Sequence, residues 1–251
     1  ENIILLGLWL IILESLGNIM NNLIGVIGGL GPKATTYFMD LVIDNTVSES
    51  DQDNVDMLVC QYSSIPDRTN FILGKSNDSP VPEMVDCAKI LDREGCKYIV
   101  IPCNTASYFF DEIQKEVSAK VINILEETSK VVLKDNPKRI GLMATDGTIK
   151  SGAYHKFIDN DLLFVPDSEY QAKVMNIIYD KVKKNKEVSL EEFEEILNYF
   201  RKNGCEIIIL GCTELSVVYS YLKIRYNDIV DSLTVLAKKT VEVSGKKLKE
   251  L

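Results

Sequence analysis

The chain repeats one short pattern at a fixed separation. The stretch GCKYIVIPCNT at residues 95–105 and the stretch GCEIIILGCTE at 204–214 both run from Gly-Cys through an apolar segment to a second cysteine and two polar residues. The separation is 109 residues at every matching position, so Cys103 corresponds to Cys212. LIGVIGGLGP at 23–32 and RIGLMATDGT at 139–148 also resemble each other. Self-similarity at a fixed distance indicates a repeated structural unit, and we expect two similar half-domains.

Apolar runs of strand length alternate with segments of helical period. This alternation predicts an α/β fold of two pseudo-symmetric half-domains, each a mostly parallel sheet flanked by helices. Ligands bind outside the carboxyl ends of such strands, so we expect the active site in the cleft between the halves. The predicted division is an atypical apolar extension at 1–19, a first half-domain at 20–125 plus 222–251, and a second at 126–221. The expected strands are 23–27, 55–60, 98–101, 121–124, 139–143, 162–165 and 206–210, and the expected helices are 34–45, 82–94, 106–117, 170–182, 190–203 and 233–248.

The composition limits the class of protein. Of 251 residues, 46% are hydrophobic and 26% are charged, which is ordinary for a globular domain. The formal net charge is −9, and the chain lacks the basic stripe of a nucleic-acid-binding protein. The apolar run at 3–13 is too short to span a bilayer, so we expect no membrane partner.

Six cysteines without a CxxC motif favour free thiols in a reducing compartment, and therefore a cytoplasmic location. Cys96 and Cys103 are an odd number of residues apart on a strand-like run, as are Cys205 and Cys212. Their side chains would point to opposite faces of a strand, so a four-cysteine metal site is not expected.

The matched cysteines suggest a reaction. Helical segments are expected to begin just after Cys103 and Cys212, and a helix N-terminus lowers the pKa of a thiol and binds anions. Two thiols that face one cleft could remove a proton from one side of a carbon and return one to the other side, which inverts a stereocentre. The other four cysteines are predicted to be small buried apolar side chains: Cys60, Cys87, Cys96 and Cys205.

Five segments carry a resemblance to a known family, in this order: GVIGGLGPKAT, IPDRTNFILG, VIPCNTA, LMATDGTIKSGAY and IILGCTELS. From residue 23 onward the chain resembles the aspartate racemase branch of the aspartate/glutamate racemase superfamily. The first turn, GGLGP, favours this branch, because glutamate racemases usually have Asp-Ser-Gly there. The resemblance implies a two-domain α/β isomerase, often a homodimer, that racemises aspartate or glutamate with neither pyridoxal phosphate nor a metal as cofactor.

The resemblance also implies residue roles. Cys103 and Cys212 would be the acid/base pair, one on each face of the substrate Cα. Arg68 would clamp the side-chain carboxylate, since a guanidinium matches a carboxylate bidentately, although an ion pair at a surface or interface is the alternative. Glu214 would orient a thiol or accept the substrate ammonium, or would only favour the helix N-terminus. The other substrate-binding candidates, some of which are equally suited to be helix caps, are Gly31, Ser63, Asn104, Thr105, Thr145 and Thr213.

The chain departs from the family pattern at three positions, of which the mildest is Leu30, where the family's first glycine loop often carries Met. Ser107 stands where the family commonly has His, and the one histidine, His155, is expected on an exposed helix. The family lysine of the second half-domain corresponds to Lys173 only with a displacement of one position, or about 100° around a helix. Lys173 is retained as a candidate clamp.

Three other functions remain open. Gly29, Gly31 and Ala34 fit the spacing of a dinucleotide-binding turn, but the next strand ends in Cys60-Gln61 and not in the acidic residue that holds a ribose. Two cysteines are also compatible with sibling reactions, such as maleate-type isomerisation or hydantoin racemisation. A binding protein that senses an acidic amino acid would bind the ligand without exchanging its α-hydrogen.

Overall fold

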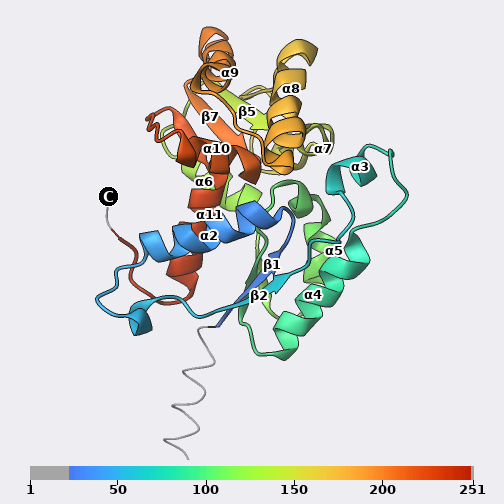
Figure 1. Ribbon diagram of the computed structural model, residues 1–251, viewed down its shortest axis with the longest axis vertical. Coiled ribbons are helices and arrows are strands. Elements are labelled where there is room, and N and C mark those ends of the chain that lie inside the picture. The colour runs from blue at the N-terminus through green and yellow to red at the C-terminus, as the bar shows by residue number, and fades with distance from the viewer. Residues whose placement is uncertain (1–22, 250–251) are drawn as a thin grey trace, which may run out of the picture.

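The computed structural model describes residues 23–249, so the predicted extension at 1–19 lies outside the described residues (Figure 1). Two four-stranded parallel sheets form its framework, with the strand orders β2-β1-β3-β4 and β6-β5-β7-β8. The two orders are equivalent, which confirms the predicted α/β class and the repeated half-domain. The strands are β1 Ile24–Gly28, β2 Met57–Gln61, β3 Tyr98–Val100, β4 Lys120–Ile122, β5 Ile140–Ala144, β6 Leu163–Phe164, β7 Ile207–Gly211 and β8 Ile229–Asp231.

The matched sequence repeats occupy the matched central strands. β1 and β5 are the second strands of their sheets, and all five residues of each are buried. β3 and β7 are the third strands, and each carries one of the apolar runs that precede Cys103 and Cys212. Central parallel strands are covered on both faces by helices, which explains why their residues are continuously apolar.

Helices connect the strands and separate the two lobes of Figure 1. Helix α11 runs between the lobes and contacts α2, α6 and strands of both sheets. The α-helices are α2 Pro32–Asn45, α3 Arg68–Ile72, α4 Val81–Arg93, α5 Phe110–Gln114, α6 Ile124–Val132, α7 Asp146–Lys150, α8 Ser168–Met175, α9 Leu190–Lys202, α10 Thr213–Tyr221 and α11 Ser232–Val243. Short 3-10 helices occupy η1 Asp51–Asp53, η2 Thr105–Phe109, η3 Ala153–Lys156 and η5 Val182–Lys184, and η4 Asn176–Lys181 is π-helical.

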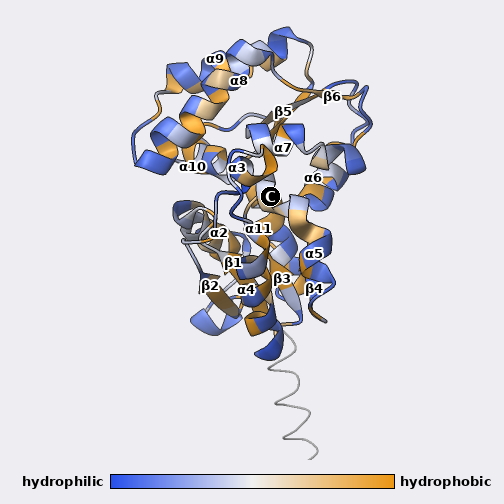
Figure 2. Ribbon diagram, turned by 90° about the vertical axis from the view of Figure 1, so that its right-hand side faces the viewer, coloured by the Kyte–Doolittle hydropathy of each residue, from blue (hydrophilic) through white to orange (hydrophobic). Residues whose placement is uncertain are grey.

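Three apolar clusters form the core, and the first of them joins the halves. It brings Ile24 of β1 together with Ile140 of β5 and Leu236 of α11, all of which are fully buried. The other two clusters each lie within one half-domain. Hydrophobic colour accordingly follows the strands and the inward helix faces in Figure 2. Because the shared cluster buries side chains from both sheets, the halves are packed together around α11.

Several boundaries differ from the sequence predictions, and two of these differences concern the half-domain division and the end of a strand. The predicted division at residue 222 assigns β8 to the first half-domain, but β8 pairs with β7 through Ile208 and Ile229 and therefore extends the second sheet. The strand predicted at 121–124 ends at Ile122, because the Asn123 side chain accepts a hydrogen bond from Leu125 N and begins helix α6. This cap starts a helix that the periodicity alone did not indicate.

Candidate active site

Two buried thiols lie at the carboxyl ends of matching strands. Cys103 follows β3, and Cys212 follows β7 as the N-cap residue of α10. Both are buried, with exposed fractions of 6% and 5%. They line one inner cavity of about 10 Å³, which has room for roughly one water molecule. The cleft expected between the half-domains therefore exists around the two cysteines, in a narrow form.

A larger outer cavity of about 440 Å³ adjoins the inner one. Four charged residues line both cavities: Asp67, Arg68, Lys183 and Glu214. Gly31 and Ser63 line the outer cavity, whereas Asn104, Thr105, Thr145 and Thr213 line the inner one. Apart from Lys173, the structure thus brings all the predicted site residues to the walls of two neighbouring cavities.

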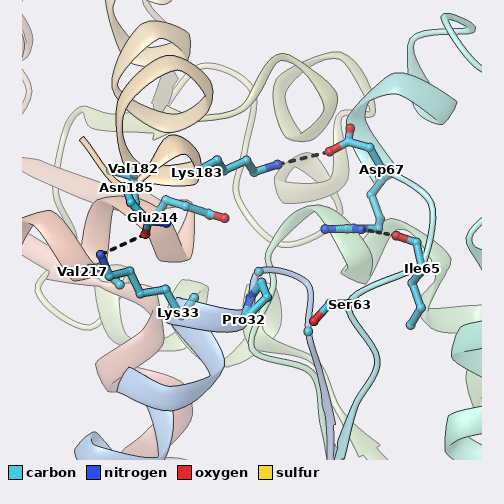
Figure 3. Close-up of a pocket in the computed structure, with 14 residues that line it drawn as sticks. Pro32, Lys33, Ser63, Ile65, Asp67, Val182, Lys183, Asn185, Glu214 and Val217 are labelled. Atoms are coloured by element: carbon cyan, nitrogen blue, oxygen red, sulfur yellow. Dashed lines mark hydrogen bonds and ion pairs between the residues drawn. The ribbon is translucent and has the colours of Figure 1, made fainter. Parts of the chain in front are cut away.

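Lys173 lies elsewhere, and Lys183 occupies the place expected of it. The Lys173 ammonium lies 2.7 Å from Glu195 and 3.2 Å from Glu169, all in the second half-domain, and it lines neither of the two cavities. Lys183 instead reaches across to Asp67 (Figure 3), and its Nζ lies 3.1 Å from Asp67 Oδ2. The sequence did not single out Lys183, because the lysine run around it has the pattern of a solvated helix face.

Asp67, Tyr179 and Lys183 join the two halves at the wall of the inner cavity. The Tyr179 hydroxyl donates to the Asp67 carboxylate at 3.1 Å, and the Lys183 ammonium lies 3.8 Å from the Tyr179 ring centroid. Burial disfavours the charged form of Lys183, but Glu214, Tyr179 and Asp67 outweigh this and raise its pKa. Lys183 therefore stays a cation at neutral pH.

Arg68 is buried with part of its hydrogen-bonding capacity unused. Its Nη1 donates to Ile65 O at 3.2 Å and Pro66 O at 2.9 Å, and its Nη2 donates to Leu30 O at 2.9 Å. Nε is buried and has no partner among the described residues. A guanidinium has five N–H donors, so Nε and one donor of Nη2 remain for a bound anion. Nε lies on the guanidinium edge that typically contacts a carboxylate, so Arg68 retains a buried donor for an anion.

Glu214 connects the second cysteine to the first half-domain. The Cys212 thiol donates to Glu214 Oε2 at 3.0 Å. The other carboxylate oxygen lies close to the Gly31 backbone, since a Cβ built on Gly31 would be 3.1 Å from Oε1. The absence of a side chain at Gly31 therefore allows the carboxylate to approach this turn.

The acidity of both thiols differs from the sequence expectation. The prediction of a lowered pKa at a helix N-terminus is wrong here, because burial dominates. Burial raises the pKa of Cys103, with Arg68 opposing the rise. Burial and the Glu214 carboxylate hold the pKa of Cys212 well above its usual value, with Lys183 opposing. The environment thus makes Cys103 the thiol next to a cation and Cys212 the thiol next to an anion.

The Asn104 side-chain amide is hydrogen-bonded to two other residues of the fold, one at its oxygen and one at its nitrogen. The Tyr154 hydroxyl donates to Asn104 Oδ1 at 2.8 Å, and Asn104 Nδ2 donates to the Ser232 hydroxyl at 2.8 Å. Ser232 in turn donates to Leu210 O at 2.7 Å, two residues before Cys212. This chain links the loop of Cys103 to the strand that ends at Cys212. The Asn104 amide therefore holds the loop of Cys103 in place, and these two bonds leave one Nδ2 hydrogen and one Oδ1 lone pair unused.

Three threonine hydroxyls form a second link between the halves. Thr105 Oγ1 lies 3.0 Å from both Thr145 Oγ1 and Thr148 Oγ1. Thr145 also caps α7 by accepting from Thr148 N at 3.1 Å, which is the alternative that the sequence left open for it. Hydroxyls can exchange partners by rotation, so this group can satisfy a bound carboxylate without moving the backbone.

The described chain offers neither a metal cluster nor a membrane helix. Within residues 23–249, no three His, Cys, Asp or Glu side chains are grouped as metal ligands. The helices of the same range lack the length and apolar character that crossing a membrane requires. His155 is exposed on the 3-10 helix η3, and Ser107 is buried in η2.

Two parallel-sheet half-domains enclose a charged cleft that is lined by two thiols. This arrangement is typical of an α/β enzyme that acts on small polar molecules. The sequence matches the Asp/Glu/hydantoin racemase family over residues 27–240, and the chain belongs to this family.

Known relatives agree with this assignment. The broad-specificity amino-acid racemase RacX of Bacillus subtilis (strain 168) is 29% identical over 231 residues, which cover 87% of this chain and 96% of RacX. The glutamate racemase of Aquifex pyrophilus is 29% identical over 170 residues, or 65% of each chain. Among solved structures, the aspartate racemase of Picrophilus torridus superimposes with a TM-score of 0.80 at 31% identity, covering 90% of this chain and 96% of that one.

Proposed function

We propose that this racemase interconverts the enantiomers of aspartate, or of a closely related acidic amino acid, by two-base catalysis at Cα. The two bases are Cys103 and Cys212. The observation that carries the proposal is that these thiols, from matching strand ends, line the same buried cavity with Arg68, Lys183 and Glu214.

In the proposed reaction one cysteine acts as a thiolate and the other as a thiol. The thiolate removes the α-proton of the substrate, and the electron pair of the C–H bond passes into the α-carboxylate as a planar carbanion forms. The opposite thiol then protonates the other face, which gives the mirror-image product and leaves the charges of the two sulfurs exchanged. A buried thiolate whose pKa is raised is a stronger base than an exposed one, which suits a weakly acidic C–H bond.

The charge distribution supports a substrate with two carboxylates. Arg68 and Lys183 supply two cations at the cavity walls, and Glu214 supplies an anion for the substrate ammonium. Arg68 has its Nε free for a carboxylate, and a charge-assisted contact of this kind contributes about 1.5–3 kcal/mol. Burial raises the pKa of both thiols, so both rest protonated at neutral pH; Cys103, which lies near the cation Arg68, loses its proton more readily than Cys212, whose pKa the Glu214 carboxylate raises further.

Substrate entry requires the inner cavity to widen. Small-molecule pockets typically enclose about 300–1,000 Å³, far more than the 10 Å³ found between the cysteines. The outer cavity of about 440 Å³ is the natural entrance, because it shares four charged residues with the inner one. Separation of Lys183 and Tyr179 from Asp67 would open the path between them.

The experiment is a racemisation assay without added cofactor. Purified protein is incubated with L-aspartate, and the enantiomers are separated by chiral chromatography for wild type, Cys103→Ser and Cys212→Ser. D-Aspartate should accumulate with wild type and with neither variant. Cys205→Ser, a buried cysteine outside the cavities, is the matched control and should keep its activity.

Different results of this assay would contradict different parts of the proposal. If wild type racemises glutamate but not aspartate, the substrate is this related acidic amino acid and not aspartate, and the two-thiol mechanism stands. If calorimetry shows that aspartate binds while neither amino acid is racemised, the chain is a binding protein. Activity retained in either active-site cysteine variant would contradict two-base catalysis.

A homodimer and independence from cofactors are parts of the proposal that stay predictions. Light scattering on the purified protein tests the first. Racemase activity after extensive dialysis against a metal chelator, with the absorbance of pyridoxal phosphate absent from the spectrum, tests the second.

A further inference from the structure

Two cysteines outside the active site lie in contact with each other. Cys60 lies near the end of β2, and Cys87 lies on α4. Their sulfurs are 3.1 Å apart. The sequence predicts both as isolated buried apolar side chains, and their separation of 27 positions gave no sign of a pair.

The two thiols differ in access. Among the six cysteines, all of which lie in the described part of the chain, Cys60 is the one that is not buried. It lies on β2, the edge strand of the first sheet, whereas Cys87 faces the core with an exposed fraction of 2%. An oxidant from solvent therefore meets Cys60 before Cys87, Cys103 or Cys212.

We propose that Cys60 and Cys87 are a reversible redox pair that hydrogen peroxide, or another small neutral oxidant, converts to a disulfide. The sulfurs must approach by only ~1 Å to reach bonding distance. A neutral oxidant is specified because Asp86 and Glu83 place negative charge beside Cys87. Anionic disulfides such as oxidised glutathione would be repelled.

The reaction has two balanced steps. The Cys60 thiolate attacks one peroxide oxygen, so that an S–O bond forms, the O–O bond breaks and hydroxide leaves, giving a sulfenic acid. The Cys87 sulfur then attacks the sulfenic sulfur, the S–S bond forms, and hydroxide leaves as the S–O bond breaks. Overall, two thiols and one peroxide give one disulfide and two waters, and an external dithiol reverses the change by exchange.

Cys87 suits the second role and not the first. Burial, with contributions from Cys60, Asp86 and Glu83, raises the pKa of Cys87 to about 12. Its thiolate is therefore scarce at neutral pH, and it reacts only with an electrophile that is already held beside it. The contact with Cys60 provides this electrophile once Cys60 is oxidised.

The position of the pair gives the disulfide a consequence. The bond would close residues 61–86 into a ring, and this segment carries Ser63, Asp67 and Arg68. Cross-linking the ends of a loop restricts the unfolded chain and stabilises the fold. Oxidation should therefore raise Tm by roughly 5–10 °C. The proposal concerns the covalent state of the enzyme, so it is tested independently of racemase activity.

The test is peptide mapping of the full-length protein. The reduced protein is treated with hydrogen peroxide, free thiols are blocked with N-ethylmaleimide, and a non-reducing digest is analysed by mass spectrometry. The expected product is one linked peptide that contains Cys60 and Cys87, lighter than the two thiol peptides by two hydrogens, with Cys103 and Cys212 still alkylated after unfolding. A dithiol should restore both free peptides and the lower Tm.

Variants make the result specific. Cys60→Ser and Cys87→Ser should abolish the linked peptide and the gain in Tm, whereas Cys96→Ser, a buried cysteine of the same half-domain, should keep both. The proposal is overturned if wild type accumulates sulfinic acid at Cys60 with Cys87 still free. It is equally overturned if Cys103 and Cys212 are oxidised first. Wild-type mapping decides between these outcomes even if a variant fails to fold.

Discussion

Replacing Lys183 by Met should lower kcat/KM for aspartate strongly, while replacing Lys173 by Met should not. Methionine keeps the length and apolar stem of lysine and removes only the ammonium. Lys183 lines both cavities and is partly buried, with 27% of its side chain exposed. Lys173 is paired with Glu169 and Glu195 away from the two cavities. The two variants therefore remove the same charge from two different places.

The magnitude follows from one charge-assisted contact to the substrate. Such a contact contributes about 1.5–3 kcal/mol, which corresponds to a roughly tenfold to 150-fold loss of kcat/KM. Loss of the pair with Asp67 adds little to this, because both side chains are still partly exposed to water. Lys173→Met should change kcat/KM by less than about twofold, as expected for surface pairs.

Lys183→Met should also move the pH dependence. The Lys183 cation opposes the rise in pKa of both thiols. Without it the thiolate is less favourable, so both pKa values rise further, and the activity that needs a thiolate should appear only at higher pH. The assay is kcat/KM for L- and D-aspartate across about pH 6–10 for wild type and both variants, a range that starts below the usual pKa of a thiol and records where activity begins to rise.

Two outcomes would refute this reasoning. Lys183→Met with kcat/KM within twofold of wild type would show that Lys183 does not hold the substrate. An equal loss in Lys173→Met would show that net charge matters and the position of the lysine does not.

Three further predictions concern the support of the site. Tyr154→Phe leaves Asn104 Oδ1 buried without its 2.8 Å donor, so urea unfolding should show a loss of about 1–3 kcal/mol and kcat should fall roughly tenfold with KM less affected. Glu214→Gln removes the anion that, after burial, most raises the pKa of Cys212, so iodoacetamide should alkylate Cys212 faster at neutral pH; an unchanged rate would contradict the assigned cause. Gly29→Ala places a Cβ 2.5 Å from the Tyr62 backbone at φ +91°, so Tm should drop by several degrees, on the order of 2 kcal/mol or more, and a neutral result would show that the turn relaxes freely.

The sequence predicted those parts of the molecule that depend on local pattern. The alternation of strands and helices, the equivalence of the halves and the location of Cys103 and Cys212 at strand ends all depend on short segments and their order. Parallel strands end at one edge of a sheet, so the residues that follow them converge without further information.

Prediction from the sequence failed where the position or the hydrogen-bond partner of a side chain depends on irregular helix geometry or on residues far away in the chain. Lys183 follows a π-helical segment, Asn176–Lys181, and lies in a 3-10 turn, so counting at about 100° per residue from Lys173 could not locate it. Asn104 is occupied by Ser232, which is 128 positions away, and no local pattern records this pairing. The pKa of each active-site thiol depends on its depth of burial, which only the packed structure shows.

The most direct measurement of two-base catalysis is deuterium incorporation during the first turnovers. L-Aspartate with hydrogen at Cα is incubated with the enzyme in deuterated buffer, and both enantiomers are isolated early and analysed by NMR. If separate thiols remove and return the proton, the new D-aspartate should carry deuterium at Cα while the remaining L-aspartate still carries hydrogen. D-Aspartate should give the mirror result. Equal early labelling of substrate and product, or product formed without deuterium, would contradict the assignment of Cys103 and Cys212 as two opposed bases.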